Sequence, residues 1–254
     1  MRNLLLLILV LICFDDAFAQ SKKYSVSNAH SHNDYEQKEA LTLALSKGFG
    51  SIEADVFLQE DSLFVAHYSH EIKRGRTLEK LYLNPLAEEA KKYKGYAYAN
   101  KAPLQLLIDL KTDAEPTLTK LIQILDPYSA MLYPKGGIQI VITGNRPEPA
   151  DYGNFPKYIY FDGRPENDYT KQELKRVGLV SQSFRNYSKW MGLGEINQED
   201  KVVLQEVVNQ VHKKGKKIRF WADPDTPETW ELMKKLGVDY INTDKISELS
   251  SYLK

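Results

Sequence analysis

Residues 51–67 read Ser51-Ile-Glu-Ala-Asp-Val-Phe-Leu-Gln-Glu-Asp-Ser-Leu-Phe-Val-Ala-His67, which is two apolar strand-like runs separated by four polar residues. So short a connection predicts an antiparallel hairpin, because a parallel pair needs a crossover of roughly a dozen residues or more. Side chains alternate between the two faces of a strand, so Glu53 and Asp55 are expected to point the same way. The hairpin then brings His67 back roughly opposite Asp55. Two carboxylates and an imidazole therefore converge, and the carboxylates can hold one hard cation between them.

The rest of the chain alternates short β-type runs with helical patterns, which indicates parallel strands joined by crossover helices. Strands are predicted at residues 24–29, 51–57, 105–110, 138–142, 157–161, 179–183, 217–222 and 239–242, with 63–67 as the hairpin arm. Helices are predicted at residues 36–47, 77–94, 115–126, 168–177, 197–214, 226–236 and 245–252. This order predicts an α/β fold, a closed (β/α)8 TIM barrel with an extra β-hairpin arm after strand 2. An open doubly wound sheet is the alternative.

Residues 1–19 are typical of a secretory signal peptide. They combine a short positive start, a continuously apolar run over 4–13, and an Ala-Phe-Ala ending at Ala19. The apolar run is too short to span a bilayer, so we expect cleavage after Ala19 and a secreted or periplasmic protein. The remaining residues, 20–254, are expected to form a single barrel domain. Cys13 is the only cysteine, so this domain would contain neither disulfides nor thiolate metal ligands.

The charge pattern excludes several classes of partner. The formal net charge is +0 and both signs are interspersed along the chain, which argues against a nucleic-acid groove. The sequence contains no basic amphipathic helix that would attach it permanently to a membrane. We therefore expect no nucleic-acid partner and at most transient membrane contact through loops.

Polar residues gather at the predicted carboxyl ends of the strands, where the active site of a (β/α)8 barrel lies. The first strand is followed by His30 and His32, and the seventh strand carries Trp221. The third strand places Asp109 and Lys111 two residues apart, and therefore on one face.

Carboxylates at inward positions of a barrel are costly unless they are paired or bind a metal. Glu53 and Asp55 on the second strand and Asp109 on the third would lie close together at the barrel mouth. Oxygen ligands suit Mg²⁺ or Ca²⁺. These three acids are therefore a candidate site for one divalent cation.

The order of these groups resembles that of the phospholipase-C-like phosphodiesterase superfamily of barrels. This superfamily includes the glycerophosphodiester phosphodiesterases and the sphingomyelinase D enzymes. The resemblance is carried by His30, Glu53-x-Asp55, His67, Asp109-x-Lys111 and Trp221. Within the superfamily, the stretches His30-Ser-His-Asn-Asp-Tyr35, Ser51-Ile-Glu-Ala-Asp-Val56 and Val65-Ala-His67 most resemble the altered-inheritance-of-mitochondria protein 6 family.

The resemblance covers essentially the whole of residues 20–254, with two departures. Glycerophosphodiesterases typically have His-Arg-Gly at the first strand, where this chain has His30-Ser-His32. Their third acid is usually Glu, whereas here it is Asp109, as in the sphingomyelinase D pattern. These departures leave the chemistry in place but leave the substrate open.

The resemblance implies a secreted, metal-dependent phosphoric diester hydrolase that acts on a glycerophosphodiester or a phospholipid headgroup. Glu53, Asp55 and Asp109 would bind the Mg²⁺ or Ca²⁺ ion. His30 and His67 would flank the phosphorus as the acid and base pair, a task that suits the pKa of imidazole. In this superfamily a neighbouring hydroxyl of the substrate often attacks first, which gives a cyclic phosphate.

Four further residues are expected to contact the substrate, namely His32, Asn33, Lys111 and Trp221. Lys111 would place a point charge on the phosphate, or it would merely pair with Asp109. Trp221 would stack on a choline-like headgroup or pack at the barrel mouth. His32 would be a second functional histidine or a structural one.

Two other classes of function fit parts of the pattern. The spacing of His30 and His32 also occurs in metal-dependent amidohydrolases, but those enzymes need further histidines from the middle strands. None of the five histidines lies in the strands predicted between residues 105 and 183, which argues against that class. The second alternative is a non-catalytic secreted barrel that binds a sugar or a phospholipid headgroup, which the sixteen tyrosines would suit.

Overall fold

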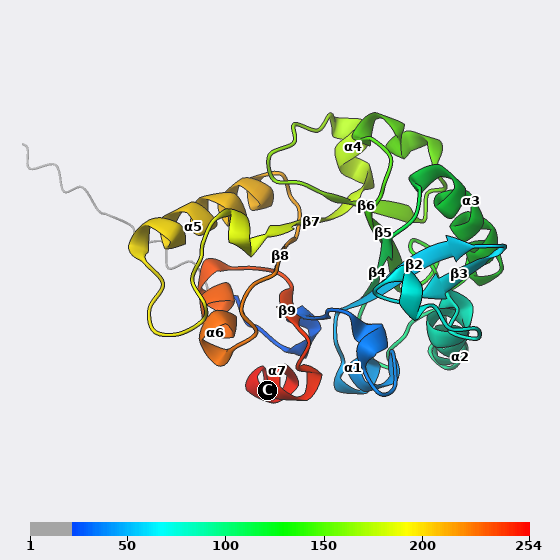
Figure 1. Ribbon diagram of the computed structural model, residues 1–254, viewed down its shortest axis with the longest axis horizontal. Helices are drawn as coiled ribbons and strands as arrows, with labels where there is room; N and C mark the ends of the chain where they lie inside the picture. The colour runs from blue at the N-terminus through cyan, green and yellow to red at the C-terminus, as the bar shows by residue number, and fades with distance from the viewer. Residues whose placement is uncertain (1–21) are drawn as a thin grey trace, which may run out of the picture.

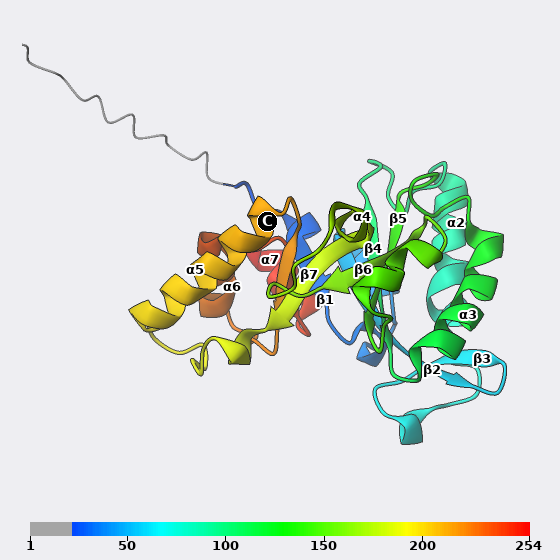
Figure 2. The ribbon, with the colours of Figure 1, turned by 90° about the horizontal axis from the view of Figure 1, so that it is seen from above.

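The computed structural model describes residues 22–254, so the predicted signal peptide at 1–19, its cleavage site and Cys13 lie outside the described residues. Eight parallel strands form a nearly closed barrel with helices packed around it (Figures 1 and 2). The predicted (β/α)8 TIM barrel is therefore confirmed, and the open sheet is excluded. Within residues 22–254 no helix is both long and apolar enough to cross a membrane.

Neighbouring strands follow the order β8-β7-β6-β5-β4-β2-β1-β9, and β3 pairs with β2 outside this path. The strands are β1 (Ala29–Ser31), β2 (Ser51–Gln59), β3 (Ser62–Val65), β4 (Leu104–Leu110), β5 (Ile138–Gly144), β6 (Ile159–Gly163), β7 (Val177–Ser183), β8 (Ile218–Trp221) and β9 (Ile241–Thr243). The helices are α1 (Thr42–Lys47), α2 (Asn84–Lys92), α3 (Ala114–Leu125), α4 (Lys171–Arg176), α5 (Gln198–Lys213), α6 (Pro227–Leu236) and α7 (Ile246–Tyr252).

The β2–β3 hairpin forms as the sequence predicts. The two strands pair antiparallel, with Val56 opposite Val65 and Gln59 opposite Ser62. Glu60 takes up a positive φ of 55° in the tight turn between them. β2 is longer than its parallel neighbours β1 and β4. Its last residues therefore extend past the barrel, where they pair with β3.

The first predicted strand and helix begin later than expected. Residues Val26–Asn28 form a 3₁₀ turn, because the Asn28 side chain accepts the Ser25 N–H (3.2 Å) and the Asn28 N–H donates to the Ser25 carbonyl (2.8 Å). β1 therefore starts only at Ala29. Helix α1 is delayed because the buried carboxylate of Asp34 accepts the Leu41 N–H and holds the preceding loop irregular.

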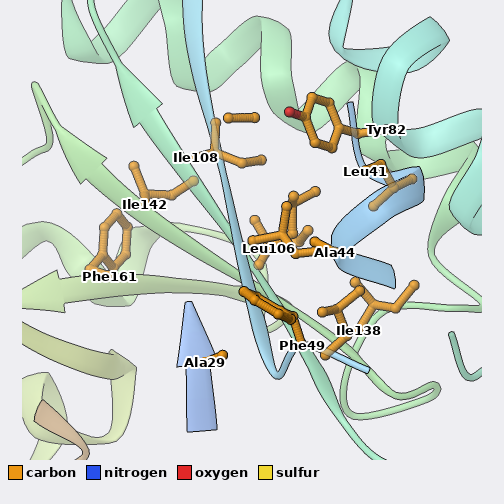
Figure 3. Packing of buried hydrophobic residues seen from close by; sticks show 14 of the residues in the cluster. Ala29, Leu41, Ala44, Phe49, Tyr82, Leu106, Ile108, Ile138, Ile142 and Phe161 are labelled. Atoms are coloured by element: carbon orange, nitrogen blue, oxygen red, sulfur yellow. The ribbon is translucent and has the colours of Figure 1, made fainter. Parts of the chain in front are cut away.

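The hydrophobic core is divided by the barrel wall. A large cluster lies between the strands and the surrounding helices, and Figure 3 shows part of it, including Leu106, Ile142 and Phe161. A small separate cluster consists of Leu107, Val141, Leu179 and Tyr240. The small cluster fills the lower interior of the barrel, in the way that layers of inward side chains fill such barrels. Polar inward positions lie above it at the cavity, and also below Leu107, where Gln105 Nε2 donates to Ser51 Oγ (2.8 Å).

The seam between β8 and β9 is closed by a bridge between Arg219 and Tyr240 and by the backbone and side chain of Asp239. Asp239 donates its N–H to the Ile218 carbonyl (3.0 Å), and its Oδ2 accepts the Ile218 N–H (2.9 Å). The same carboxylate accepts hydrogen bonds from His212 Nε2 (2.8 Å) and Lys22 Nζ (2.5 Å). Burial alone would raise the pKa of Asp239, but these hydrogen bonds outweigh burial and hold the pKa below its ordinary value. His212 is thus structural, as its place late on a helix indicated.

The lowered pKa of Asp239 predicts how the stability of the seam depends on pH. A carboxyl with a lower pKa in the folded state contributes stability above its unfolded value, near pH 4, and loses it as the pH falls through the folded value. We expect Asp239→Asn to lower the free energy of unfolding at pH 7 by about 1–2 kcal/mol, and the difference from the wild type to shrink below pH 4. Urea unfolding followed by circular dichroism measures both, with exposed Asp61→Asn as the control. An equal difference at pH 3 and pH 7 would contradict an electrostatic role.

Candidate active site

A cavity of about 350 Å³ opens at the carboxyl ends of the barrel strands. Its lining consists of His32, Asn33, Glu53, Asp55, His67, Asp109, Lys111, Thr143, Gly144, Arg164, Ser181, Arg219 and Trp221. Every predicted site residue except His30 is part of this lining. The structure therefore brings together side chains that lie far apart in the sequence.

The three predicted metal ligands converge on one wall of the cavity. Asp55 on β2 and Asp109 on β4 are direct partners in the parallel ladder, and Glu53 lies two residues below Asp55 on the same face. One oxygen atom from each carboxylate can be chosen so that all three lie within 4.8 Å of one another. Gly144 makes room for this group, because a Cβ at its position would collide with Oδ1 of Asp109.

Two carboxylate oxygens of this group are buried without a hydrogen-bond partner among residues 22–254, namely Oδ1 of Asp55 and Oδ1 of Asp109. Unpartnered buried oxygens of charged groups are costly, so they mark a place for a ligand. Burial, followed by repulsion from Glu53 and Asp109, raises the pKa of Asp55 to about 6. Burial also raises the pKa of Asp109. The three acids are therefore not fully compensated by the protein alone.

Lys111 pairs with two of these acids. Its Nζ lies 2.8 Å from Asp55 Oδ2 and 2.8 Å from Asp109 Oδ2. Burial would lower the pKa of Lys111, but the two carboxylates outweigh it and raise the pKa above its ordinary value. Lys111 is therefore a permanent cation at the cavity wall. Its contact with a substrate phosphate stays a prediction.

His30 lies beneath the cavity floor rather than in the cavity. Its side chain is fully buried, with Nδ1 2.7 Å from Ser51 Oγ and Nε2 2.7 Å from Glu53 Oε2. Arg219 contacts the same Nε2 and donates to Glu53 Oε2 (2.6 Å). Burial, and then the charge of Arg219, lowers the pKa of His30 to about 3. Both ring nitrogens are occupied, so His30 supports Glu53 in this arrangement, and its role beside the phosphorus stays a prediction.

Arg219 is the buried counterion of Glu53. Burial would raise the pKa of Glu53, but Arg219 and the hydrogen bond from His30 outweigh it and hold the pKa well below its ordinary value. The sequence analysis did not single out Arg219. Its position two residues before Trp221 on β8, and therefore on the same inward face, was the signal that could have revealed it.

His32 and His67 are the histidines that reach the cavity, and the Nδ1 of each ring is hydrogen-bonded within the protein. His32 Nδ1 lies 2.8 Å from Asp244 Oδ1 at the end of β9. Burial lowers the pKa of His32, but the hydrogen bond to Asp244 and the charge of Glu53 outweigh it, so the pKa is raised. His67 Nδ1 lies 3.4 Å from Asp55 Oδ2. In both rings Nε2 has no partner in the described part of the chain, so it is available to a bound molecule.

A tyrosine hydroxyl links these groups. The OH of Tyr35 lies 2.8 Å from Asp55 Oδ2, 2.9 Å from Asn33 Oδ1 and 3.0 Å from His67 Nδ1. Asn33 itself has a left-handed backbone conformation, with φ of 45°, which turns the chain into the cavity directly after His32. The predicted place of Asn33 at the site is therefore supported by a specific loop geometry. Tyr35 was not predicted.

The opposite wall of the cavity is built around a second buried carboxylate. Asp162 on β6 is fully buried, and its Oδ2 accepts hydrogen bonds from Thr143 Oγ1 (2.9 Å), Ser181 Oγ (2.5 Å) and Arg164 Nη1 (2.9 Å). Thr143, Arg164 and Ser181 all line the cavity. The sequence analysis missed this group, although Asp162-Gly163-Arg164 at a strand end has the same acid-x-base spacing as Asp109-x-Lys111. Trp221 completes the lining and is 37% exposed.

Two family models match this chain. The model described as AIM6-like phosphodiesterase domain matches residues 20–148, which is just over half of the chain. The model described as glycerophosphoryl diester phosphodiesterase family matches residues 217–246. The first match contains the carboxylates and both cavity histidines, and the second contains Arg219 and Trp221.

Whole-chain comparisons agree with these matches. Altered inheritance of mitochondria protein 6 homolog of Arthroderma benhamiae is 28% identical over 260 residues, which cover 88% of this chain and 82% of that protein. Altered inheritance of mitochondria protein 6 of Eremothecium gossypii is 26% identical over 278 residues, covering 89% and 69%. A calcium-dependent phosphoinositol-specific phospholipase C from Pseudomonas sp. has a TM-score of 0.57 at 12% identity and covers 90% of this chain and 93% of that one. At that identity the likeness shows the fold.

The buried pair of Arg219 and Glu53 makes a prediction about stability. Arg219→Met would leave the Glu53 carboxylate buried with His30 as its only close support, and breaking one partner of a buried pair costs about 3 kcal/mol or more. We expect urea unfolding in the presence of EDTA to show that Arg219→Met lowers the free energy of unfolding by that amount. Lys120→Met, which removes an exposed pair with Asp61, is the control and should change the free energy of unfolding by less than about 1 kcal/mol. Equal effects of the two substitutions would show that Arg219 does not hold Glu53.

Proposed function

The chain belongs to the family of AIM6-like phosphodiesterase domains, and from that premise we propose that it is a metal-dependent phosphoric diester hydrolase. The proposed substrate is a glycerophosphodiester or the headgroup of a phospholipid. The observation that carries the proposal is the cavity, where three converging carboxylates lie beside two histidines whose Nδ1 atoms are held by hydrogen bonds to the protein. This combination suits the cleavage of a phosphodiester, which needs charge neutralisation and proton transfer together.

Glu53, Asp55 and Asp109 would hold one Mg²⁺ or Ca²⁺ ion. Their oxygen-only donor set suits a hard cation, and the unpartnered Oδ1 atoms of Asp55 and Asp109 would gain a ligand. A bound divalent cation polarises a phosphoryl oxygen and offsets developing negative charge. Arg219 would keep Glu53 ionised and fixed in position.

His32 and His67 would carry out proton transfer on the two sides of the phosphorus. The Nδ1 of His32 is hydrogen-bonded to Asp244, and the Nδ1 of His67 to the hydroxyl of Tyr35. These contacts fix both rings and leave Nε2 for the substrate. One imidazole would take a proton from the attacking water or hydroxyl, and the other would donate a proton to the leaving oxygen. The raised pKa of His32 suits the donor. His32 thereby takes the role that the family resemblance assigned to His30, which lies below the cavity and keeps a supporting role.

Lys111, Asn33 and Trp221 would contact the substrate. Lys111 lies next to the carboxylates, so its charge would act on the phosphate group itself. Where the substrate carries a hydroxyl beside the phosphodiester, attack by that hydroxyl would give a cyclic phosphate before hydrolysis. We further propose that the enzyme is exported after removal of residues 1–19.

A non-catalytic barrel that binds a sugar or a headgroup is the second candidate function. It is favoured by the ion pairs that Lys111 and Arg219 already make with the acids, because a purely structural network would contain the same pairs. The unpartnered oxygens of Asp55 and Asp109 favour the enzyme over this alternative. Metal-dependent turnover separates the two.

Phosphorus NMR of a phosphodiester panel tests the reaction class. Glycerol, inositol, choline and lysolipid diesters are incubated with the protein and Mg²⁺ or Ca²⁺, and again with EDTA. We expect a cyclic phosphate or a phosphomonoester to appear from at least one class only when the metal is present, and Asp109→Asn to weaken metal binding in calorimetry. Tight metal binding without turnover of any diester would favour the non-catalytic barrel.

Substitution of the histidines tests their roles. Removing a general acid or base typically costs about 100-fold or more in turnover, so we expect losses of that size for His32→Ala and for His67→Ala, with the fold and metal binding retained. His70→Ala, in the exposed loop after His67, is the matched control and should retain activity. Full activity of His32→Ala would contradict this assignment and would favour His30 as the histidine of the first strand that transfers the proton.

A further inference from the structure

Large apolar side chains are exposed around the cavity mouth. Of seven such residues in the described chain, four lie at the carboxyl ends of the strands or in the loops that follow, and we call them the mouth rim: Tyr68, Met191, Leu193 and Trp221. Leu193 is 78% exposed, Met191 63% and Tyr68 55%. Single exposed apolar residues are ordinary, but a group around a cavity marks a contact surface.

The connection between β7 and α5 is built to expose Met191 and Leu193. The turn is closed by the Trp190 indole, whose Nε1 donates to the Leu193 carbonyl (3.0 Å). It is anchored by Arg185, which donates to the Trp190 carbonyl (3.0 Å), and by Ser188 Oγ, which accepts the Trp190 N–H (3.0 Å). Several hydrogen bonds therefore fix a turn whose apolar side chains point away from the protein.

This turn is packed directly beside the cavity wall. Gly192 has φ of 78°, and a Cβ there would lie 2.8 Å from side-chain atoms of Pro224 and Thr226. Thr226 Oγ1 also donates to the Gly192 carbonyl (3.3 Å). Pro224 and Thr226 belong to the connection that begins directly after Trp221, which lines the cavity. The turn that carries Met191 and Leu193 is therefore held against the connection that leaves the cavity at Trp221.

Tyr68 extends the mouth rim on another side of the cavity. It directly follows His67, which lines the cavity, and the two rings meet edge to face with centroids 4.4 Å apart. The Tyr68 ring also stacks on His70 at 5.5 Å. Figure 2 shows that the β2–β3 hairpin and the segment after it project on the same side of the molecule as the yellow connection between β7 and α5.

Basic residues flank both parts of the mouth rim. Arg185 and Lys189 are exposed beside the Met191 turn, and Lys73 and Arg74 are exposed in the loop after Tyr68. Glu71 and Glu195 are the exposed acids of these two segments, so basic residues are in excess. Apolar and aromatic side chains beside basic ones are the combination that binds an anionic membrane surface.

We propose that the mouth rim docks this protein on anionic lipid bilayers, with the cavity facing the headgroups. The cavity size fits this arrangement, because about 350 Å³ of mostly charged lining has room for a headgroup while the acyl chains stay in the bilayer. The proposal goes beyond the proposed function, since binding to a membrane requires no turnover. A protein that binds vesicles without hydrolysing any diester would support it all the same.

Vesicle co-sedimentation tests the docking surface in the full chain. The probes are vesicles of phosphatidylcholine alone and of phosphatidylcholine with phosphatidylglycerol. We expect binding to the anionic vesicles, and binding roughly tenfold weaker or more for the double variant Met191→Ser with Leu193→Ser, because two exposed apolar side chains no longer enter the interface. The matched control is Val202→Ser with Val203→Ser, an exposed apolar pair on α5 (45% and 41%), which should bind like the wild type.

A local readout separates the mouth rim from every other segment of the chain. Leu193→Trp and Val203→Trp are compared in vesicles that contain brominated lipids, which quench tryptophan that enters the bilayer. We expect clearly stronger quenching for Leu193→Trp. Attachment through another segment would not produce this difference.

Three outcomes would overturn the proposal. They are absence of vesicle binding, equal binding by the two double variants, and equal quenching of the two tryptophan variants. Self-association that disappears with Met191→Ser and Leu193→Ser, in a protein that does not bind vesicles, would reassign the mouth rim to contact between copies of this chain.

Discussion

The structure depends on the need to compensate three carboxylates inside a barrel. Glu53, Asp55 and Asp109 face inward from two neighbouring strands, where isolated charges would be prohibitively costly. Arg219 from β8 and Lys111 from the end of β4 supply the opposite charge. The barrel must close for this to happen, because β2 and β8 lie far apart in the strand order and their side chains meet only across its interior.

This constraint explains the layers of the interior. The lower layer is apolar, with Leu107, Val141, Leu179 and Tyr240 in contact. Polar side chains beside it bind one another, as in the cluster of His30, Glu53 and Arg219, although Arg219 Nε has no hydrogen-bond partner among residues 22–254. The side chains nearest the carboxyl ends of the strands line the cavity. Depth along a strand therefore decides the role of a residue: His30 has both nitrogens bonded and a lowered pKa, while His32, two residues later, keeps one nitrogen available.

Periodicity and spacing predicted much of this arrangement, because they depend on local geometry. The hairpin followed from a short connection, and the common face of Glu53 and Asp55 followed from strand alternation. Depth could not be predicted, since alternation assigns His30 and His32 to one face without saying which lies at the cavity. Asp162 and Arg164 share the acid-x-base spacing of Asp109 and Lys111, but the sequence does not show that Thr143 and Ser181 from the neighbouring strands surround the Asp162 carboxylate.

The charges of the side chains that line the cavity do not cancel. Asp162 and Arg164 cancel each other, whereas three carboxylates face only Lys111 and Arg219 on the other wall, which leaves one negative charge. Burial, and then repulsion from Glu53 and Asp109, raises the pKa of Asp55 to about 6, so the excess charge contributes to this rise. A divalent cation would change this net charge from one negative to one positive. That positive charge would balance the single negative charge of a phosphodiester. The electrostatic balance of the cavity thus supports the phosphodiester substrate that we propose for it.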